Sequence, residues 1–170
     1  EFKSWLEAMD TTDSAADAIP MPEPPNEIRD YHLITSEQEL RQWNNDLRAA
    51  GEFAVDTETT SISYMQAELV GFSFAAEPGR AAYVPVGHDY PGAPDQVSLD
   101  AALALLKPLL EDPSLTKIGQ NIKYDMSVLA KYGVTLAGPL FDTMLESYVY
   151  NSTATRHNMD ALAERYLGRS

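Results

Sequence analysis

The sequence lacks cysteine altogether and is poor in basic residues. The absence of cysteine excludes disulfides, zinc sites built on thiolates and cysteine nucleophiles. Only 12 Lys and Arg oppose 26 Asp and Glu among 170 residues, which gives a formal net charge of −14. A chain this acidic repels a phosphate backbone at long range, so nucleic-acid binding through a basic surface is not expected. The composition does allow a site where carboxylates hold divalent cations and the cations meet a phosphate.

The sequence also lacks any long apolar run. No stretch approaches the roughly 18 residues that a membrane span needs. The opening segment, EFKSWLEAMD, lacks the basic and apolar regions of a signal peptide. Because the absence of cysteine also fits a reducing compartment, we expect a cytoplasmic protein that does not bind membranes, and a monomer. The chain does not begin with Met, so we expect an excised piece of a longer protein.

Length and local composition divide the chain into three parts. Residues 1–9 place Phe2 and Trp5 at helical spacing, and we interpret them as the tail of a preceding domain. Residues 10–30 are acidic, contain PMPEPP and have little to bury, which predicts a linker. Residues 31–170 are long enough to bury a core and are expected to form one globular domain.

Hydrophobic periodicity in the globular part predicts strands and helices in mixed order. Ser36 and Glu39 form a capping box that opens a helix ending near Ala50. Residues 31–35 predict a first strand or a lead-in to that helix. Further strands are expected at 53–57, 69–75, 81–86, 115–119 and 140–141, and further helices at 99–111, 121–132, 142–150 and 157–167. The turn at 77–80 makes 69–75 and 81–86 an antiparallel hairpin. The series predicts an α/β domain with a mixed sheet.

Two acids follow a buried strand directly. In FAVDTET, Asp56 and Glu58 are spaced i, i+2, so they point to the same face, roughly 7 Å apart along the backbone. Two carboxylates held together repel each other unless a cation lies between them. Hard ions such as Mg²⁺ or Mn²⁺ prefer such oxygen ligands. Taken alone, the triplet is more often a solvated strand end.

A third acid follows another strand. In IGQNIKYD the strand ends at Gly119, Asn121 is expected to cap a helix, and Asp125 lies one turn into that helix. The Asp125 carboxylate could face the sheet edge that carries the first two acids. The alternative is an ordinary first-turn acid that complements the helix dipole.

Other polar residues have simpler explanations. Asp142 is expected to cap the helix that follows it, and His157 to start the last helix. Two interpretations of Arg156 are equally good: it contacts a phosphate, or it is an ordinary surface cation.

Taken together, these motifs resemble a known family. The segments FAVDTET, LVGFSFA, AAYVPVGHDY, LLKPLLED, KIGQNIKYD, FDTMLESY and NSTATRHNMDALAERYL occur in family-like order between residues 53 and 167. They resemble the 3′→5′ exonuclease (proofreading) domain of bacterial DNA polymerase I, of family A, in the ribonuclease-H-like superfamily. The resemblance implies a ribonuclease-H-like mixed sheet flanked by helices. It also implies action near the bacterial nucleoid, beside the 5′-nuclease and polymerase domains of a parent chain, and makes residues 1–9 the end of that 5′-nuclease domain.

The resemblance also implies a role for particular residues. Asp56 would bridge two Mg²⁺ or Mn²⁺ ions, Glu58 would hold the nucleophile's ion, and Asp125 would support the other through water. The substrate would be the 3′ end of single-stranded DNA, hydrolysed at its terminal phosphodiester. The residues implied in DNA binding are Thr57, Ile62, Gln120, Asn121, Tyr124 and, toward a phosphate, Arg156.

One part of the family pattern has no match. The family's third motif supplies a Tyr and a final Asp, and the sequence ends at Ser170 before reaching it; Tyr166 is too early. We therefore expect a C-terminally truncated domain with weak nuclease activity or none, although its parent would proofread. Two alternatives stay open: a domain that binds a DNA end without cutting it, and a structural spacer between nuclease and polymerase.

Overall fold

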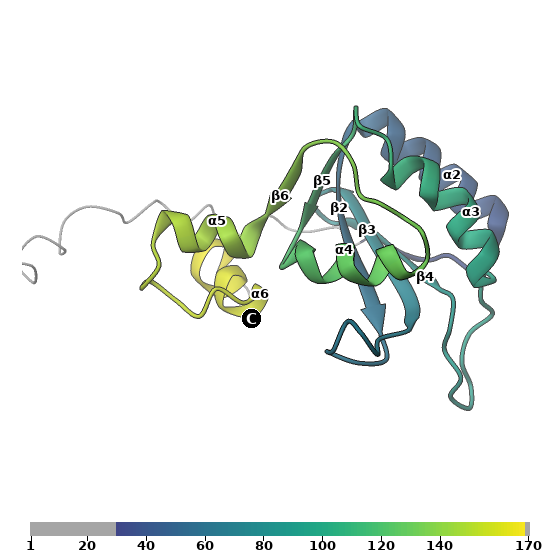
Figure 1. Ribbon diagram of the computed structural model, residues 1–170. Helices are drawn as coiled ribbons and strands as arrows, with labels where there is room; N and C mark the ends of the chain where they lie inside the picture. Colours follow the sequence, from purple (N-terminus) through teal and green to yellow (C-terminus); the bar gives the residue numbers. More distant parts are fainter. Residues whose placement is uncertain (1–29, 169–170) are drawn as a thin grey trace, which may run out of the picture.

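The computed structural model describes residues 30–168, which form one mixed sheet with helices (Figure 1). The expectations for residues 1–9, and for the linker up to residue 29, lie outside the described residues. The strands are β1 (Asp30–Leu33), β2 (Glu52–Thr59), β3 (Leu69–Glu77), β4 (Arg80–Pro85), β5 (Thr116–Gly119) and β6 (Leu140–Asp142). The helices are α2 (Glu37–Ala50), α3 (Leu99–Leu110), α4 (Ile122–Lys131), α5 (Thr143–Tyr150) and α6 (Met159–Leu162), followed by the π-helical turn η1 (Ala163–Leu167). The predicted α/β class is confirmed.

The sheet has six strands in the order β1-β4-β3-β2-β5-β6. β3 pairs antiparallel with both β2 and β4, so the predicted hairpin is confirmed. The other three pairings, β1 with β4, β2 with β5 and β5 with β6, are parallel. Strand β2 therefore lies inside the sheet, with β5 on one side, and the turn after β5 lies near the end of β2.

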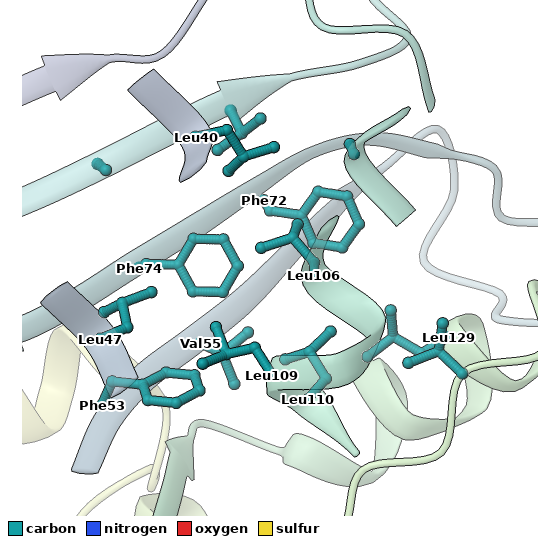
Figure 2. Close-up of a cluster of buried hydrophobic side chains, with 14 of the residues drawn as sticks. Leu40, Leu47, Phe53, Val55, Phe72, Phe74, Leu106, Leu109, Leu110 and Leu129 are labelled. Carbon is teal, nitrogen blue, oxygen red and sulfur yellow. The ribbon is translucent and has the colours of Figure 1, made fainter. Parts of the chain in front are cut away.

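Alternation along β2 separates the core from the candidate site. Phe53, Val55 and Thr57 are buried, whereas Ala54 and Glu58 on the opposite face are exposed. The buried face packs against α2 and α3, which lie side by side over the sheet (Figure 1). Figure 2 shows the centre of this core, with phenylalanines of β2 and β3 against leucines of α2, α3 and α4: Phe53, Phe72, Phe74, Leu40, Leu47, Leu106, Leu109, Leu110 and Leu129.

The ends of α2 follow the predicted sequence signals. The Ser36 hydroxyl accepts a hydrogen bond from the Glu39 N–H at 3.3 Å, and the Ser36 N–H donates to the Glu39 carboxylate at 3.1 Å. Gly51 ends the helix with a left-handed φ of +76°, which glycine adopts without strain. The capping box is therefore confirmed.

The last predicted helix is wrong at its start. Instead of one helix over 157–167, α6 begins at Met159 and passes into η1 at Ala163. His157 does not start it, because its φ is +57° and its side chain is buried, with 3% exposed. Asn158 is the cap, since its side chain accepts from the Ala161 N–H. The periodicity of the segment did not reveal that the His157 side chain has partners on another helix.

A buried lysine was not predicted at all. Lys117 lies in β5 with no exposed surface, and its ammonium group donates to the carbonyls of Asp112, Leu115 and Ala137 at 2.6–3.1 Å. Burial lowers the pKa of Lys117. The three carbonyls compensate this burial and tie β5 to the loops on both sides of it.

Among residues 30–168, no helix combines the length and the apolar character that a membrane crossing requires.

Candidate active site

Asp56 and Glu58 lie on the sheet face turned away from the core. They sit near the end of β2, where Asp56 is opposite Ser73 and Glu58 is opposite Gly71 of β3. The register shifts between Glu58 and Thr59, which is a bulge at the point where the strand leaves the sheet. The predicted i, i+2 arrangement on one strand face is thus present.

Asp125 reaches the same strand from α4. Its side chain is buried, with 2% exposed, and one carboxylate oxygen accepts from the Thr57 N–H at 2.9 Å and from the Thr57 hydroxyl at 2.6 Å. Since Thr57 lies between Asp56 and Glu58, Asp125 contacts the end of β2 that carries these acids, and its role as a metal ligand stays a prediction. The Thr57 side chain is itself buried, and its hydroxyl is committed to Asp125 rather than free for DNA.

Burial and neighbouring charges both act on the acids of the site. Burial, and then the charges of Asp125 and Glu58, raise the pKa of Asp56 to about 6. Burial also raises the pKa of Asp125, although its hydrogen bonds from Thr57 oppose this effect. A raised carboxyl pKa means that the fold disfavours the ionised form. The site therefore gathers negative charge at an energetic cost when no cation is present.

The side chains of the three acids do not converge on a single point where they could hold one ion. In the part of the chain that the structure describes, no three His, Cys, Asp or Glu side chains are arranged to hold one ion. One oxygen of Asp125 is directed at Thr57, which leaves Asp56 and Glu58 as the pair that shares a strand face. The observed conformation places the acids beside each other without joining them.

Asp142 fixes the helix that carries Asp125. Its Oδ1 accepts from the N–H groups of Asn121, Met144 and Leu145, and its Oδ2 from the N–H of Ile122, at 3.0–3.3 Å. One carboxylate thus caps both α4 and α5. The prediction that Asp142 caps α5 is confirmed, and its action on α4 was missed.

Asn121 is the N-cap residue of α4, as predicted, but its side chain does not supply the capping bond. Asn121 makes no side-chain cap bond and has a left-handed φ of +58°, because Asp142 already receives the N–H groups at the start of α4. The Asn121 side chain is exposed instead. Asparagine is one of the few residues other than glycine that adopt this conformation readily.

A groove of about 500 Å³ lies beside the acids. It is lined by Thr57, Glu58, Thr59, Thr60, Ser61, Ile62, Asn121 and Tyr124. Ile62 is 99% exposed there, in the loop between β2 and β3. The Tyr124 hydroxyl bonds to the Thr59 hydroxyl and the Ser61 carbonyl, so α4 holds this loop in place. Four of the expected DNA-binding residues therefore line one groove: Thr57, Ile62, Asn121 and Tyr124.

Gln120 and Arg156 do not line this groove, although Gln120 borders a second pocket that Asp56 also lines. The Gln120 amide donates to the His157 carbonyl at 2.8 Å and accepts from the Thr143 hydroxyl at 2.5 Å. Arg156 is exposed and forms no ion pair with any acid in residues 30–168. The structure brings neither into the groove with Ile62.

Comparison with known proteins decides the family. A family model described as 3'-5' exonuclease matches residues 31–170. The chain belongs to this 3'-5' exonuclease family. The family assignment agrees with the sequence motifs, and with the acids at the end of β2.

Curated relatives of this exonuclease domain are bacterial DNA polymerases I. The Pseudomonas aeruginosa protein is 48% identical over the whole chain, which spans 19% of that relative. The Rhizobium leguminosarum protein is 46% identical over 84% of the chain and 15% of the relative. The chain thus corresponds to a small part of each of these polymerases.

Solved structures similar to the exonuclease domain include Pol1 from Mycobacterium smegmatis, in complex with DNA primer-template and dNTP. The TM-score is 0.65 at 26% identity, over 82% of this chain and 23% of that one. Brucella melitensis NrnC bound to pGG gives 0.60 at 25% identity, over 83% of this chain and 61% of that one. Escherichia coli RNase D, an exoribonuclease, gives 0.60 at 24% identity, over 82% and 34%, and shares the fold.

The donor set of the exonuclease domain fits a divalent cation. Asp56, Glu58 and Asp125 offer only carboxylate oxygens, and none of them pairs with a Lys, Arg or His side chain in the described region. Uncompensated carboxylates at one edge of a sheet are the ligands that Mg²⁺ and Mn²⁺ prefer. A cation bound there would counter the burial, and then the charges of Asp125 and Glu58, that raise the pKa of Asp56.

Proposed function

We propose that this chain carries most of the active site of a two-metal 3′→5′ exonuclease, which removes the terminal nucleotide from single-stranded DNA. The observation that carries the proposal is the group of three acids, Asp56, Glu58 and Asp125, gathered at the end of β2 with no cationic partner among the described residues. Membership of the 3'-5' exonuclease family supports the reaction class.

The three acids have separate tasks in this proposal. When bound, Mg²⁺ or Mn²⁺ ions would supply a hydroxide nucleophile near neutral pH and would neutralise charge on the leaving 3′ oxygen. Asp56 and Glu58 would be the direct carboxylate ligands, Glu58 to the ion that activates the nucleophile, and Asp125 would support the ion beside the leaving oxygen. Thr57 keeps Asp125 in place through its N–H and hydroxyl.

The groove beside the acids receives the terminal nucleotide in this proposal. Ile62 offers an exposed apolar surface to a base. The side-chain amide of Asn121 makes no capping bond to α4 and can donate to or accept from the nucleotide. Tyr124 forms part of the wall and fixes the loop that carries Ile62. Arg156 contacts a phosphate of the same DNA strand. Gln120 lies between the end of β5 and Asn121, and faces the bound nucleotide in this proposal.

The wider setting is also a proposal. The relatives named DNA polymerase I are several times longer than this chain, which supports partners within one polypeptide, namely polymerase and 5′-nuclease domains. We propose a monomer that acts on chromosomal DNA in the bacterial cytoplasm. Since the family's third motif has no match in this sequence, we propose that the chain alone cleaves weakly or not at all.

Binding to a DNA end tests the function without requiring turnover. A fluorescent dT12 oligonucleotide and a single-stranded circle without ends are compared in MnCl₂ and in EDTA. We expect tighter binding to the oligonucleotide in MnCl₂, and loss of this preference in EDTA and in Asp56→Asn. The matched control is Asp95→Asn, which changes an exposed acid in the loop after β4 and should behave like the unmodified chain.

The same experiment separates the proposal from its alternative. If neither EDTA nor Asp56→Asn changes the affinity for dT12, the domain holds DNA without metal chemistry. Cleavage of dT12 as fast as by an intact exonuclease domain would contradict the proposed weakness of this chain.

A further inference from the structure

The loop between α5 and α6 is suited to a phosphate by its composition. Residues 151–158 read NSTATRHN, and we call this segment the Arg156 loop. It contains Arg156, several hydroxyl and amide side chains and no acid, although the chain as a whole is strongly acidic. A phosphate approaching this protein meets less repulsion here than on most of its surface.

The buried side chain of His157 bonds to the beginning of the Arg156 loop and to α5. Its Nε2 lies 3.1 Å from the Ser152 carbonyl and its Nδ1 lies 2.8 Å from the Ser147 hydroxyl of α5. A carbonyl only accepts, so Nε2–H donates to Ser152, and in the neutral ring the Ser147 hydroxyl donates to Nδ1. The ring also stacks on Tyr148, with centroids 3.9 Å apart. His157 thus ties the beginning of the loop to α5.

The backbone at His157 has an unusual conformation. With a φ of +57°, His157 adopts the left-handed conformation that residues other than glycine rarely take. The ring of His157 is buried, whereas Arg156, its neighbour in the sequence, is exposed. Conformations of this kind persist only where surrounding contacts enforce them.

Gln120 connects the Arg156 loop with the acid-bearing helix. Its amide N–H donates to the His157 carbonyl, and its amide oxygen accepts from Thr143 at the start of α5. Gln120 directly precedes Asn121, from which α4 begins. The position of Arg156 is therefore coupled by hydrogen bonds to the end of β5 and the start of α4.

We propose that His157 is a positioning residue for substrate binding, which holds the Arg156 loop so that Arg156 contacts one phosphate of the single strand, with Gln120 as its link to α4. The inference rests on the proposed function. It assigns His157, which makes no contact with DNA, and gives Gln120 a task within the protein.

The salt dependence of DNA binding tests this inference. For single strands, the slope of log K against log salt changes by about 0.7 for each phosphate contact. We expect Arg156→Ala to reduce the slope for fluorescent dT12 in CaCl₂ by about 0.7. His157→Phe keeps a ring to stack on Tyr148 but removes both hydrogen bonds, and should reduce the slope equally. The double variant should lose no more than either single one, because both changes remove the same contact.

Controls separate positioning from a loss of folding. Arg41→Ala removes an exposed cation of α2 and should leave the slope unchanged. Should His157→Phe fail to melt cooperatively, Ser147→Ala removes one of the two bonds and should give a smaller change of the same sign. A reduced fraction of folded protein lowers the apparent affinity at every salt concentration but does not alter the slope.

Different results would contradict the role of His157 and the exonuclease proposal. A full slope in folded His157→Phe, or additive losses in the double variant, would overturn the positioning role while leaving the exonuclease proposal intact. Failure of the unmodified chain to bind dT12 at low salt would overturn both.

Discussion

Replacing Asp56 with asparagine should stabilise the metal-free chain at neutral pH. The rise of the Asp56 pKa from 3.8 to about 6 corresponds to about 3 kcal/mol against the ionised side chain. Because Asp56 is only half-buried, solvent screens part of this energy, and we expect a gain of about 1–2 kcal/mol. Asparagine has nearly the same shape and no charge, so it removes the repulsion without leaving a cavity.

The sign of the pH dependence follows from the direction of the shift. Folded Asp56 binds its proton at a higher pH than the unfolded chain does, so the unmodified chain loses stability between about pH 4 and 6 and does not regain it above. Asp56→Asn has no such loss. The two proteins should therefore melt at similar temperatures near pH 4 and diverge as the pH rises.

Thermal melting in EDTA from pH 4 to pH 8 measures this difference. At about 3 °C per kcal/mol, the variant should melt roughly 3–6 °C higher at pH 8. MnCl₂ should raise the melting temperature of the unmodified chain and not that of Asp56→Asn. Asp95→Asn serves as the control for removal of one negative charge. An Asp56→Asn variant that is less stable at pH 8, or equally shifted at pH 4 and pH 8, would refute the reasoning.

Three further variants test the residues around the acids. Asp142→Asn leaves the Ile122 N–H facing an amide and weakens two helix caps, so we expect a loss of about 2–4 kcal/mol in urea unfolding; a loss typical of one cap, about 1 kcal/mol, would contradict the double role. Thr57→Val removes the hydroxyl that lowers the pKa of Asp125, so the carboxyl carbon of Asp125 should titrate at a higher pH by NMR, and an unchanged midpoint would count against this contact. Lys117→Met leaves three carbonyls without their donor and should cost about 3 kcal/mol or more by the same unfolding assay, whereas a neutral effect would mean that water replaces the ammonium group.

Local patterns predicted the part of the site that lies on β2. The alternation of FAVDTET places Asp56 and Glu58 on one face because the side-chain period of a strand is two residues. The position of Asp125 was predictable in outline, since a short strand followed directly by a helix brings the first helical turn to the end of the sheet. What Asp125 contacts was not, because Thr57 lies 68 residues away.

The parts that could not be predicted depend on partners far apart in the sequence. Asn121 resembles a cap in isolation, but Asp142 takes over that task from 21 residues away and leaves Asn121 free. His157 resembles the start of a helix until its bonds to Ser147 and Ser152 are seen. No local signal distinguishes the buried Lys117 from a surface lysine, because its acceptors are backbone carbonyls.

The most direct test of the central claim is the position of manganese in crystals of this chain soaked in MnCl₂ near pH 8. We predict an anomalous difference peak in contact with Asp56 and Glu58, at the end of β2 that Asp125 also contacts, and no such peak in Asp56→Asn crystals. Manganese that binds away from these three acids, or that binds unchanged in Asp56→Asn crystals, would contradict the claim that they form a metal site.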